Sequence, residues 1–460
     1  MSKDVRENRL GVEPILPLLI KLSIPSMLSM TIQALYNVVD SIYVGRLSTD
    51  ALSSLSIAFP LQMILISISV GTGVGASSLI SRLLGRREKK QASNVAEHVL
   101  LLSVFYGLII GLVGLFFSRD LISIFTDNPT FIDMGTEYIK IIFMGSVFLF
   151  VPMLANEILR GEGNTFVPMI SMLIGSIINI VLDPFLIFGI GPFPQLGVAG
   201  AAYATVIGRA ISGIYIVYKV LTNDQDIRIN LKNFSFKFKI IRDIYSVGLP
   251  AMIMQFLASF MVGGLNIIVG DYNQYAVAVV GIYFRLQSFV FMPVFGLNQG
   301  YMPIVGYNYG HNNPERMKET IKYGLIVGFA ITTLGFIVFQ LIPEPLIRLF
   351  NSNEELVEIG VDALKTISLA FPIIGLAIVG STTLQAVGRG VASMVVSFLR
   401  QIIVLLPVAY VLGKAGGLSW VWYAFPISEA ISFVLLVILF KNIFTKVMEK
   451  MNSTQTKLKD

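Results

Sequence analysis

Residues 25–45 read PSMLSMTIQALYNVVDSIYVG, and residues 250–270 read PAMIMQFLASFMVGGLNIIVG. The two stretches align without a gap: both begin with proline, both end with Val-Gly, and both are strongly apolar. The offset of 225 residues continues through most of the chain and pairs Gly71 and Gly75 with Gly296 and Gly300. Self-similarity of this kind predicts two parallel repeats that each build half of the fold.

The composition places both repeats in a membrane. Hydrophobic residues make up 55% of the chain and charged residues 13%, with a mean hydropathy of +0.76, whereas about a quarter of the residues of a soluble domain are charged. Several stretches without ionisable residues reach the roughly 18 residues that a transmembrane helix needs. The first is interpreted as a retained helix and not as a signal peptide. We therefore predict an all-α polytopic membrane protein with transmembrane helices at residues 14–45, 52–82, 93–118, 131–159, 165–189, 197–221, 241–270, 275–308, 317–342, 357–385, 391–413 and 418–445.

The basic residues indicate the topology. With a cytoplasmic N-terminus, most of the 34 lysines and arginines fall in cytoplasmic tails and loops, which is the positive-inside bias. This bias accounts for the net charge of +6 without nucleic acid, and it predicts that both termini are cytoplasmic. The duplication predicts an N-terminal lobe at 1–225, a cytoplasmic linker at 226–240 and a C-terminal lobe at 241–460. Alternating phenylalanines suggest that the linker lies on the membrane interface.

Enzyme chemistry is not indicated. The chain has no cysteine and only two histidines; His98 and His311 lack metal-ligand spacing, and we expect both at the surface. No HExxH, GxSxG or Walker motif is present, so we predict no enzymatic activity and no cofactor apart from a coupling ion. Residues 71–75, GTGVG, resemble a phosphate loop only superficially and predict a small-residue face for close helix packing.

Two polar stripes inside apolar spans are the candidates for function, because ionisable residues are costly in the hydrocarbon region. At helical spacing each stripe shares one face of its helix. The members are Gln33, Tyr36, Asn37 and Asp40 in the first stripe and Ser176, Asn179 and Asp183 in the second. A desolvated carboxylate takes up a proton readily, and with further oxygen ligands it holds Na⁺ instead. The stripes therefore predict a shared cation site. The alternatives are that Asp40 lies at the outer interface and that Asp183 fixes the kink at Pro184.

Pro25 and its repeat mate Pro250 occupy the same place early in the first helix of each repeat. Proline removes a backbone donor and kinks a helix. Pro25 is therefore the predicted conformational hinge.

The second repeat does not carry the two carboxylates: Leu265 and Val408 stand at the matching positions. Cation coupling is therefore predicted for the first half alone. Glu429 is the main acidic candidate of the second half, and it either pairs structurally with Arg400 or Arg285 or takes part in transport. These two arginines and Arg209 are interpreted as pair partners or helix-end anchors.

Four stretches resemble the multidrug and toxic compound extrusion (MATE) family. They are KLSIPSMLSMTIQALYNVVDSIYVGRLS (21–48), GVGASSLISRLLGRREKKQASNVAEH (73–98), ILRGEGNTFVPM (158–169) and NIVLDPFLIFGIG (179–191). The resemblance extends over nearly the whole chain. It implies two six-helix lobes related by a pseudo-two-fold axis along the membrane normal. It also implies a central cleft that opens alternately to either side and exports amphipathic, often cationic compounds against entering H⁺ or Na⁺.

The same resemblance implies which residues act. The cation site of the family corresponds to Asp40, Asn179, Asp183 and Thr205, and polar neighbours of that site correspond to Gln33, Tyr36, Asn37 and Asn156. Some Na⁺-coupled members carry acids in the seventh and tenth helices. Here Ala258 stands at the first of these positions and residues 366–388 contain no acid, so a second-lobe Na⁺ site is not expected and the coupling ion stays open.

The predicted function is a cation-coupled antiporter of the cell membrane, monomeric, that exports amphipathic cations. One rival is a lipid-linked saccharide flippase of the same superfamily, whose cleft would need cationic residues to hold pyrophosphate, whereas the central charges assigned here are acidic. The other is an uncoupled channel or a membrane scaffold. A channel would show flux without exchange.

Overall fold

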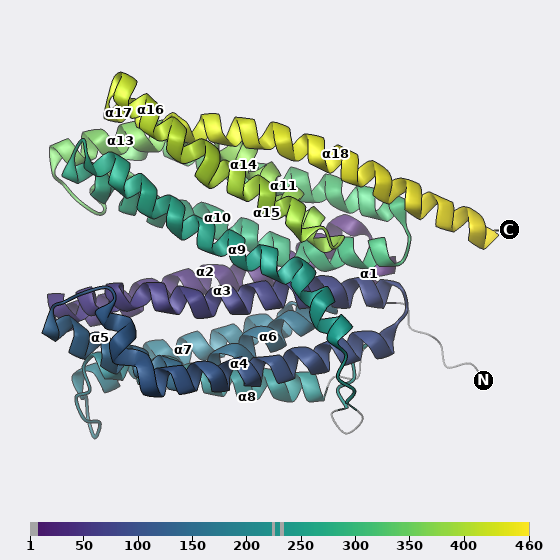
Figure 1. Cartoon of the computed structure of the whole chain (residues 1–460), viewed down its shortest axis with the longest axis horizontal. Coiled ribbons are helices and arrows are strands. Elements are labelled where there is room, and N and C mark those ends of the chain that lie inside the picture. Colours follow the sequence, from purple (N-terminus) through teal and green to yellow (C-terminus); the bar gives the residue numbers. More distant parts are fainter. Residues whose placement is uncertain (1–7, 223–225, 231–233, 460) are drawn as a thin grey trace. The chain divides into compact units, whose positions relative to one another are not determined.

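The computed structural model describes residues 8–222, 226–230 and 234–459, and every regular element within these ranges is a helix (Figure 1). The described residues contain ten helices long and apolar enough to cross a membrane, or twelve spans if each of two bent helix pairs counts as one. The predicted all-α polytopic fold class is thereby confirmed.

The two bent pairs stand where sequence predicts single helices at 131–159 and 357–385. They are α5 (Pro129–Met144) with α6 (Val147–Gly161) and α13 (Glu354–Ser368) with α14 (Phe371–Ala386), each bent by 50°. The first break falls at Gly145 and Ser146, where Ser146 Oγ donates to the carbonyl of Gly107 at 2.8 Å. This bond fixes the corner of the pair on the neighbouring helix α4.

The chain divides into two compact units. The N unit comprises Leu28–Gly248, and the C unit comprises Met1–Met27 together with Leu249–Asp460. Each unit therefore includes the start of the first helix of the other repeat. The predicted lobes, 1–225 and 241–460, do not contain this exchange. The chain leaves the C unit two residues after Pro25.

The helices of the N unit are the second part of α2 (Ile15–Leu47), α3 (Thr49–Gly85), α4 (Lys89–Ser123), α5, α6, α7 (Phe166–Phe188), α8 (Val198–Leu221) and the start of α9 (Phe238–Gly270). The C unit contains α1 (Arg9–Val12), the start of α2, the rest of α9, α10 (Gln274–Gly310), α11 (Pro314–Leu341), α12 (Pro343–Arg348), α13, α14, α15 (Gly390–Phe398), the π-helix η2 (Leu399–Leu405), α16 (Leu406–Gly416), α17 (Leu418–Val421) and α18 (Ala424–Lys459).

Repeat-related glycines hold these exchanged helix starts. In the N unit, a Cβ on Gly75 of α3, the repeat mate of Gly300, would overlap the carbonyl oxygen of Ile244 on α9. In the C unit, a Cβ on Gly300 of α10 would lie 2.8 Å from the backbone of Leu22 and Ser23 on α2. Helix backbones approach this closely only where a side chain is missing. The packing face predicted at residues 71–75 is thereby confirmed.

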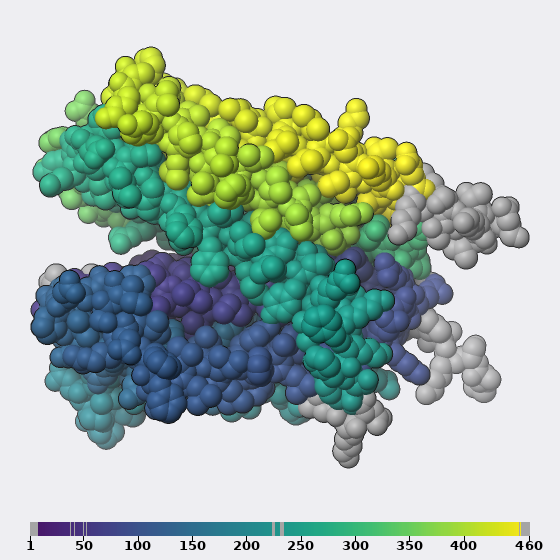
Figure 2. All heavy atoms as spheres, in the orientation of Figure 1, coloured from purple at the N-terminus to yellow at the C-terminus, as the bar shows by residue number. Residues whose placement is uncertain are grey.

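The outward faces of the helices are apolar, as a lipid environment requires. On α4 the exposed side chains include Phe105, Leu108, Leu112 and Phe116, and this helix lies at the surface of its unit (blue in Figure 2). Small residues of α4, Gly107 and Gly114 among them, are buried against α5 and α6. Bulky residues therefore face outward and small ones face the bundle.

The described part of the linker is bound to the N unit by buried polar groups. Glu162 accepts hydrogen bonds from the backbone N–H groups of Asp226 and Ile227, at 2.7 and 2.9 Å. His98 Nε2 accepts from the N–H of Lys237 at 2.9 Å, and the His98 ring contacts that of Phe234. His98 is only 2% exposed, so its predicted surface position is wrong. The interfacial position of the linker stays a prediction.

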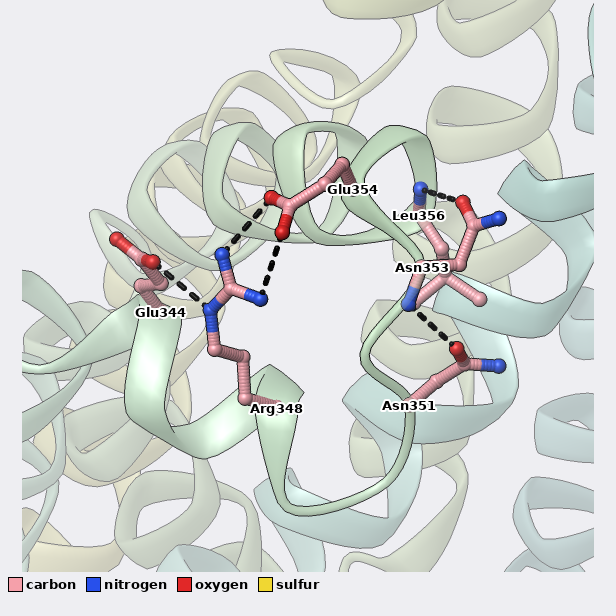
Figure 3. A network of polar contacts seen from close by, with 6 residues as sticks. All are labelled: Glu344, Arg348, Asn351, Asn353, Glu354 and Leu356. Atoms are coloured by element: carbon pink, nitrogen blue, oxygen red, sulfur yellow. Dashed lines mark hydrogen bonds and ion pairs between the residues drawn. The ribbon is translucent and has the colours of Figure 1, made fainter.

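A polar network orders the start of the second bent pair (Figure 3). Arg348 at the end of α12 forms ion pairs with Glu344 (2.9 Å) and Glu354 (2.8 Å), and Asn353 Oδ1 caps α13 by accepting from the N–H of Leu356 at 3.1 Å. These ion pairs are exposed, so solvent screens them and they add little to stability. The network sets the direction in which α13 starts.

Candidate functional site

A buried polar bridge joins α7 and α8 inside the N unit. In the orientation that gives each polar atom of the Asn179 amide a partner, Nδ2 donates to the carboxylate of Asp183 at 3.1 Å. Oδ1 accepts from the hydroxyl and the backbone N–H of Thr205, at 3.2 and 3.1 Å. Asp183 is 0% exposed. Because burying a carboxylate is costly unless it is paired or protonated, the bridge marks Asp183 as a group with a specific role.

Glycines allow the two helices to approach this closely. A Cβ on Gly208 of α8 would lie 2.6 Å from the carbonyl oxygen of Gly175 and 3.4 Å from Cβ of Asn179. Asn179 and Asp183 are one helical turn apart and therefore share a face of α7. The glycine contact presses that face against α8, where Thr205 completes the bridge.

The first polar stripe reaches the same site from α2. Asp40 lies within electrostatic range of Asp183, and the hydroxyl of Tyr36 forms a hydrogen bond with the side chain of Thr205. The atom Asp40 Oδ1 is buried and has no hydrogen-bond partner among the described residues. A buried acceptor without a partner is costly. The structure thus brings together four of the predicted residues, Asp40, Asn179, Asp183 and Thr205, with Tyr36 beside them.

Three further residues join this cluster and were not assigned to it from sequence. Gln62 of α3 donates to the hydroxyl of Tyr138 on α5 at 3.3 Å, and Tyr138 lies within electrostatic range of Asp40. Arg209 of α8 interacts electrostatically with Asp40 and with Tyr36. The spacing of four between Thr205 and Arg209 is the signal that would have placed Arg209 on this face.

The other residues predicted for the site have no described hydrogen bond to the polar cluster. Gln33 is partly buried on α2 and Asn156 is 6% exposed on α6, and none of the described hydrogen bonds joins either of them to the cluster. Asn156 Oδ1 is itself buried without a partner among the described atoms. Asn37 falls among the positions whose side chains lie outside the described residues. Pro25 lies within α2, and its role as a hinge stays a prediction.

The donor set of the cluster fits a hard monovalent cation or a proton. It consists of oxygen atoms only, from Asp40, Asp183, Asn179 and Thr205, and hard cations prefer oxygen ligands. Among the residues that the structure describes, no group of three or more His, Cys, Asp or Glu could hold a metal ion. Asp40 Oδ1, which lacks a partner among the described residues, is an oxygen that could hold a proton or Na⁺.

A second buried charge lies in the C unit. Glu429 of α18 is 8% exposed and pairs with Arg400 of the π-helix η2 at 3.4 Å. Ser428 Oγ donates to the carbonyl of Arg400 at 2.8 Å and ties the two helices together. The second carboxylate oxygen of Glu429 and the hydroxyl of Tyr283 lack partners among the described atoms. Of the two arginines considered for Glu429, the structure selects Arg400.

Comparisons with known proteins agree with this architecture. Residues 25–185 and 250–411 match the family model MatE, so the two matched segments coincide with the two repeats. The chain is 28% identical to the multidrug export protein MepA of Staphylococcus aureus (strain MRSA252), over 96% of this chain and 98% of that protein. It is also 28% identical to an FAD transporter of Shewanella oneidensis, over 90% of this chain and 92% of that protein.

A solved structure shows the same fold. The outward-facing conformation of a multidrug resistance transporter of the MATE family superposes with a TM-score of 0.91 at 27% sequence identity. The superposition covers 97% of this chain and all of the other chain. The likeness therefore extends to both repeats.

Proposed function

Since the chain belongs to the MatE family of membrane transporters, we propose that it is a multidrug exporter that exchanges an amphipathic, often cationic drug for H⁺ or Na⁺. The observation that supports this most strongly is the buried Oδ1 of Asp40, which has no partner among the described residues and lies beside the bridge of Asp183, Asn179 and Thr205. A buried acceptor without a partner in an oxygen-lined site is suited to reversible binding of a cation. The relative MepA is named as a multidrug export protein, and this supports the cargo class.

Neutralisation of the acidic pair is the proposed switch. When H⁺ or Na⁺ binds, Asp40 and Asp183 no longer repel each other, and the second part of α2 packs differently against α7 and α8. We place the bend near Pro25, because the chain passes from the C unit to the N unit two residues further on. Ion and drug drive exchange only if each binds the two conformations unequally.

The remaining parts of the proposal concern topology, assembly and cofactors, and the positive-inside distribution of basic residues supports the topology. Both termini lie in the cytoplasm, the protein works as a monomer in the cell membrane, and no cofactor is needed. Cationic drug and coupling cation are attracted by the same acidic pair, so binding of one favours release of the other. The coupling ion is H⁺ or Na⁺, since the oxygen donor set accepts either.

The test is transport in proteoliposomes that contain the purified full-length protein. A fluorescent lipophilic cation is followed under an imposed proton gradient and then under a sodium gradient. Wild-type protein is compared with Asp40→Asn and Asp183→Asn. Asp133→Asn is the matched control, because Asp133 is an exposed aspartate of the same unit, paired with Arg119.

We expect dye movement under one of the two gradients, its loss in both site variants and its retention in the control. The gradient that drives it identifies the coupling ion. If neither gradient moves the dye while the protein is folded, the proposal fails and the lipid-linked saccharide flippase becomes the better assignment. Dye movement that survives in Asp40→Asn and Asp183→Asn would locate the coupling site elsewhere.

A further inference from the structure

Arg209 is an arginine in the interior of a membrane helix. It lies in the middle of α8, inside a candidate span of mean hydropathy 1.4. A charge at this depth is costly and requires a partner or a function. Arg209 follows Gly208, whose backbone contacts Asn179, and it stands one turn after Thr205 on the face that completes the polar bridge. The helix packing therefore directs this arginine toward the acidic site.

The guanidinium is attracted to the site without being fixed to it. It interacts electrostatically with Asp40 and Tyr36 on α2 and with Tyr138 on α5. Within the described ranges the guanidinium forms no ion pair and donates no hydrogen bond. The backbone carbonyl of Arg209 accepts a hydrogen bond from Ser212 Oγ at 3.0 Å. The Glu429–Arg400 pair of the C unit, by contrast, is in direct contact at 3.4 Å.

The described charged groups at this site come from three helices, α2, α7 and α8. Asp40 on α2 and Asp183 on α7 contribute two negative charges when ionised, and Arg209 on α8 contributes one positive charge. The other described groups that contact the site are neutral: Tyr36, Tyr138, Gln62, Asn179 and Thr205. The ionised site therefore carries a single net negative charge.

We propose that Arg209 is a tethered counter-cation that balances one of the two carboxylates, so that a single monovalent cation neutralises the site. This inference rests on the proposed function, because it assumes that a cation binds at Asp40 and Asp183. Arg209 also competes with that cation for Asp40, which weakens cation binding and favours release. Arg209 is in this sense a positioning residue that sets the affinity and the number of coupling ions.

The inference predicts a change in cation affinity. Two unit charges about 10 Å apart at an effective dielectric constant of about 20 interact strongly enough to change a binding constant about tenfold. Arg209→Met keeps most of the apolar stem of the side chain and removes its charge, so it should bind the coupling cation about tenfold more tightly. Arg209→Lys keeps the charge and should retain the wild-type affinity.

The experiment measures thermal unfolding of the purified full-length protein in detergent. Sodium is titrated against choline at constant ionic strength, and proton binding is followed in a separate pH series, so the two possible cations are distinguished. Without added cation, Arg209→Met should have a lower Tm than wild type. Its Tm should rise to the wild-type value at a lower cation concentration than wild type needs for its own stabilisation. A merely structural role would lower the Tm equally at all concentrations. Arg209→Lys is the control, because it keeps the charge, and it should follow wild type in both titrations.

The outcomes separate this inference from the proposed function. If wild type responds to a cation through Asp40 but Arg209→Met responds identically, the counter-cation is refuted and the proposed function stands. If wild type responds to neither cation, both are refuted. If Arg209→Met instead loses stabilisation by added FAD while its cation response is unchanged, Arg209 serves an anionic substrate and the inference is wrong.

Discussion

A methyl group added at a close helix crossing provides a sharp test of the packing that holds the exchanged helix starts. Gly300 of α10 faces the backbone of α2, and an added Cβ would lie 2.8 Å from Leu22 C and Ser23 N. Ordinary contacts of a Cβ begin at 3.4 Å, so the two helices must separate by about 0.6 Å. Overpacking of this kind costs about 1–3 kcal/mol.

Gly263→Ala is the matched control, since nothing lies within 4 Å of a Cβ at Gly263. Both substitutions gain the same helix propensity, about 1 kcal/mol for alanine over glycine. The difference in stability between the two variants therefore measures the cost of overpacking at the helix crossing. Domains of this size change their Tm by roughly 2–4 °C for each kcal/mol. We expect Gly300→Ala to unfold several degrees below Gly263→Ala in thermal unfolding in detergent. Equal Tm values would refute the close crossing.

Three further substitutions probe the buried polar groups. His98→Ala removes the acceptor for the N–H of Lys237, and trypsin should cut the linker at Lys237 several times faster than in wild type. Glu429→Gln leaves the Arg400 guanidinium without a counter-charge, which should cost up to about 3–5 kcal/mol of stability; adding Arg400→Met should restore most of the lost Tm. Asn179→Ala removes the bridge and should cost about 1–3 kcal/mol, with weaker cation binding in the same thermal titration.

Each of these predictions has a result that contradicts it. Unchanged trypsin cleavage in His98→Ala would mean that the bond to Lys237 does not hold the linker. A double variant Glu429→Gln/Arg400→Met that regains its Tm but loses transport would assign the pair to transport and not to structure. Asn179→Ala with wild-type stability and cation binding would remove Asn179 from the site.

The helical content and the polar stripes could be predicted because they depend on spacing along a single helix. The repeats could be predicted because the two halves of the sequence align at a constant offset. The carboxylates of Asp40 and Asp183 could be nominated for the same reason: an acid inside an apolar span is costly, and it is retained mainly where it serves a function. The glycine crossings were also accessible, since small residues four apart favour close packing.

Features that depend on which helices meet could not be predicted. Arg209 was interpreted as a pair partner or a helix-end anchor and was not assigned to the site, because its approach to Asp40 depends on how α8 packs against α2 and α7. His98 was expected at the surface because it stands beside a basic loop, yet the linker folds back and buries it. No proline stands next to residues 145–146, so the bend there was not predicted and residues 131–159 were expected to form one helix.

Coupled counterflow tests the central claim most directly. In proteoliposomes loaded with a lipophilic cationic drug and set up without any ion gradient, an antiporter that uses the Asp40/Asp183 site must convert the drug gradient into movement of H⁺ or Na⁺ in the opposite direction. We predict that outward drug flow drives inward flow of one of these ions in wild type, and that Asp183→Asn abolishes this ion flow. Drug flow without opposite ion movement in wild type would contradict the account.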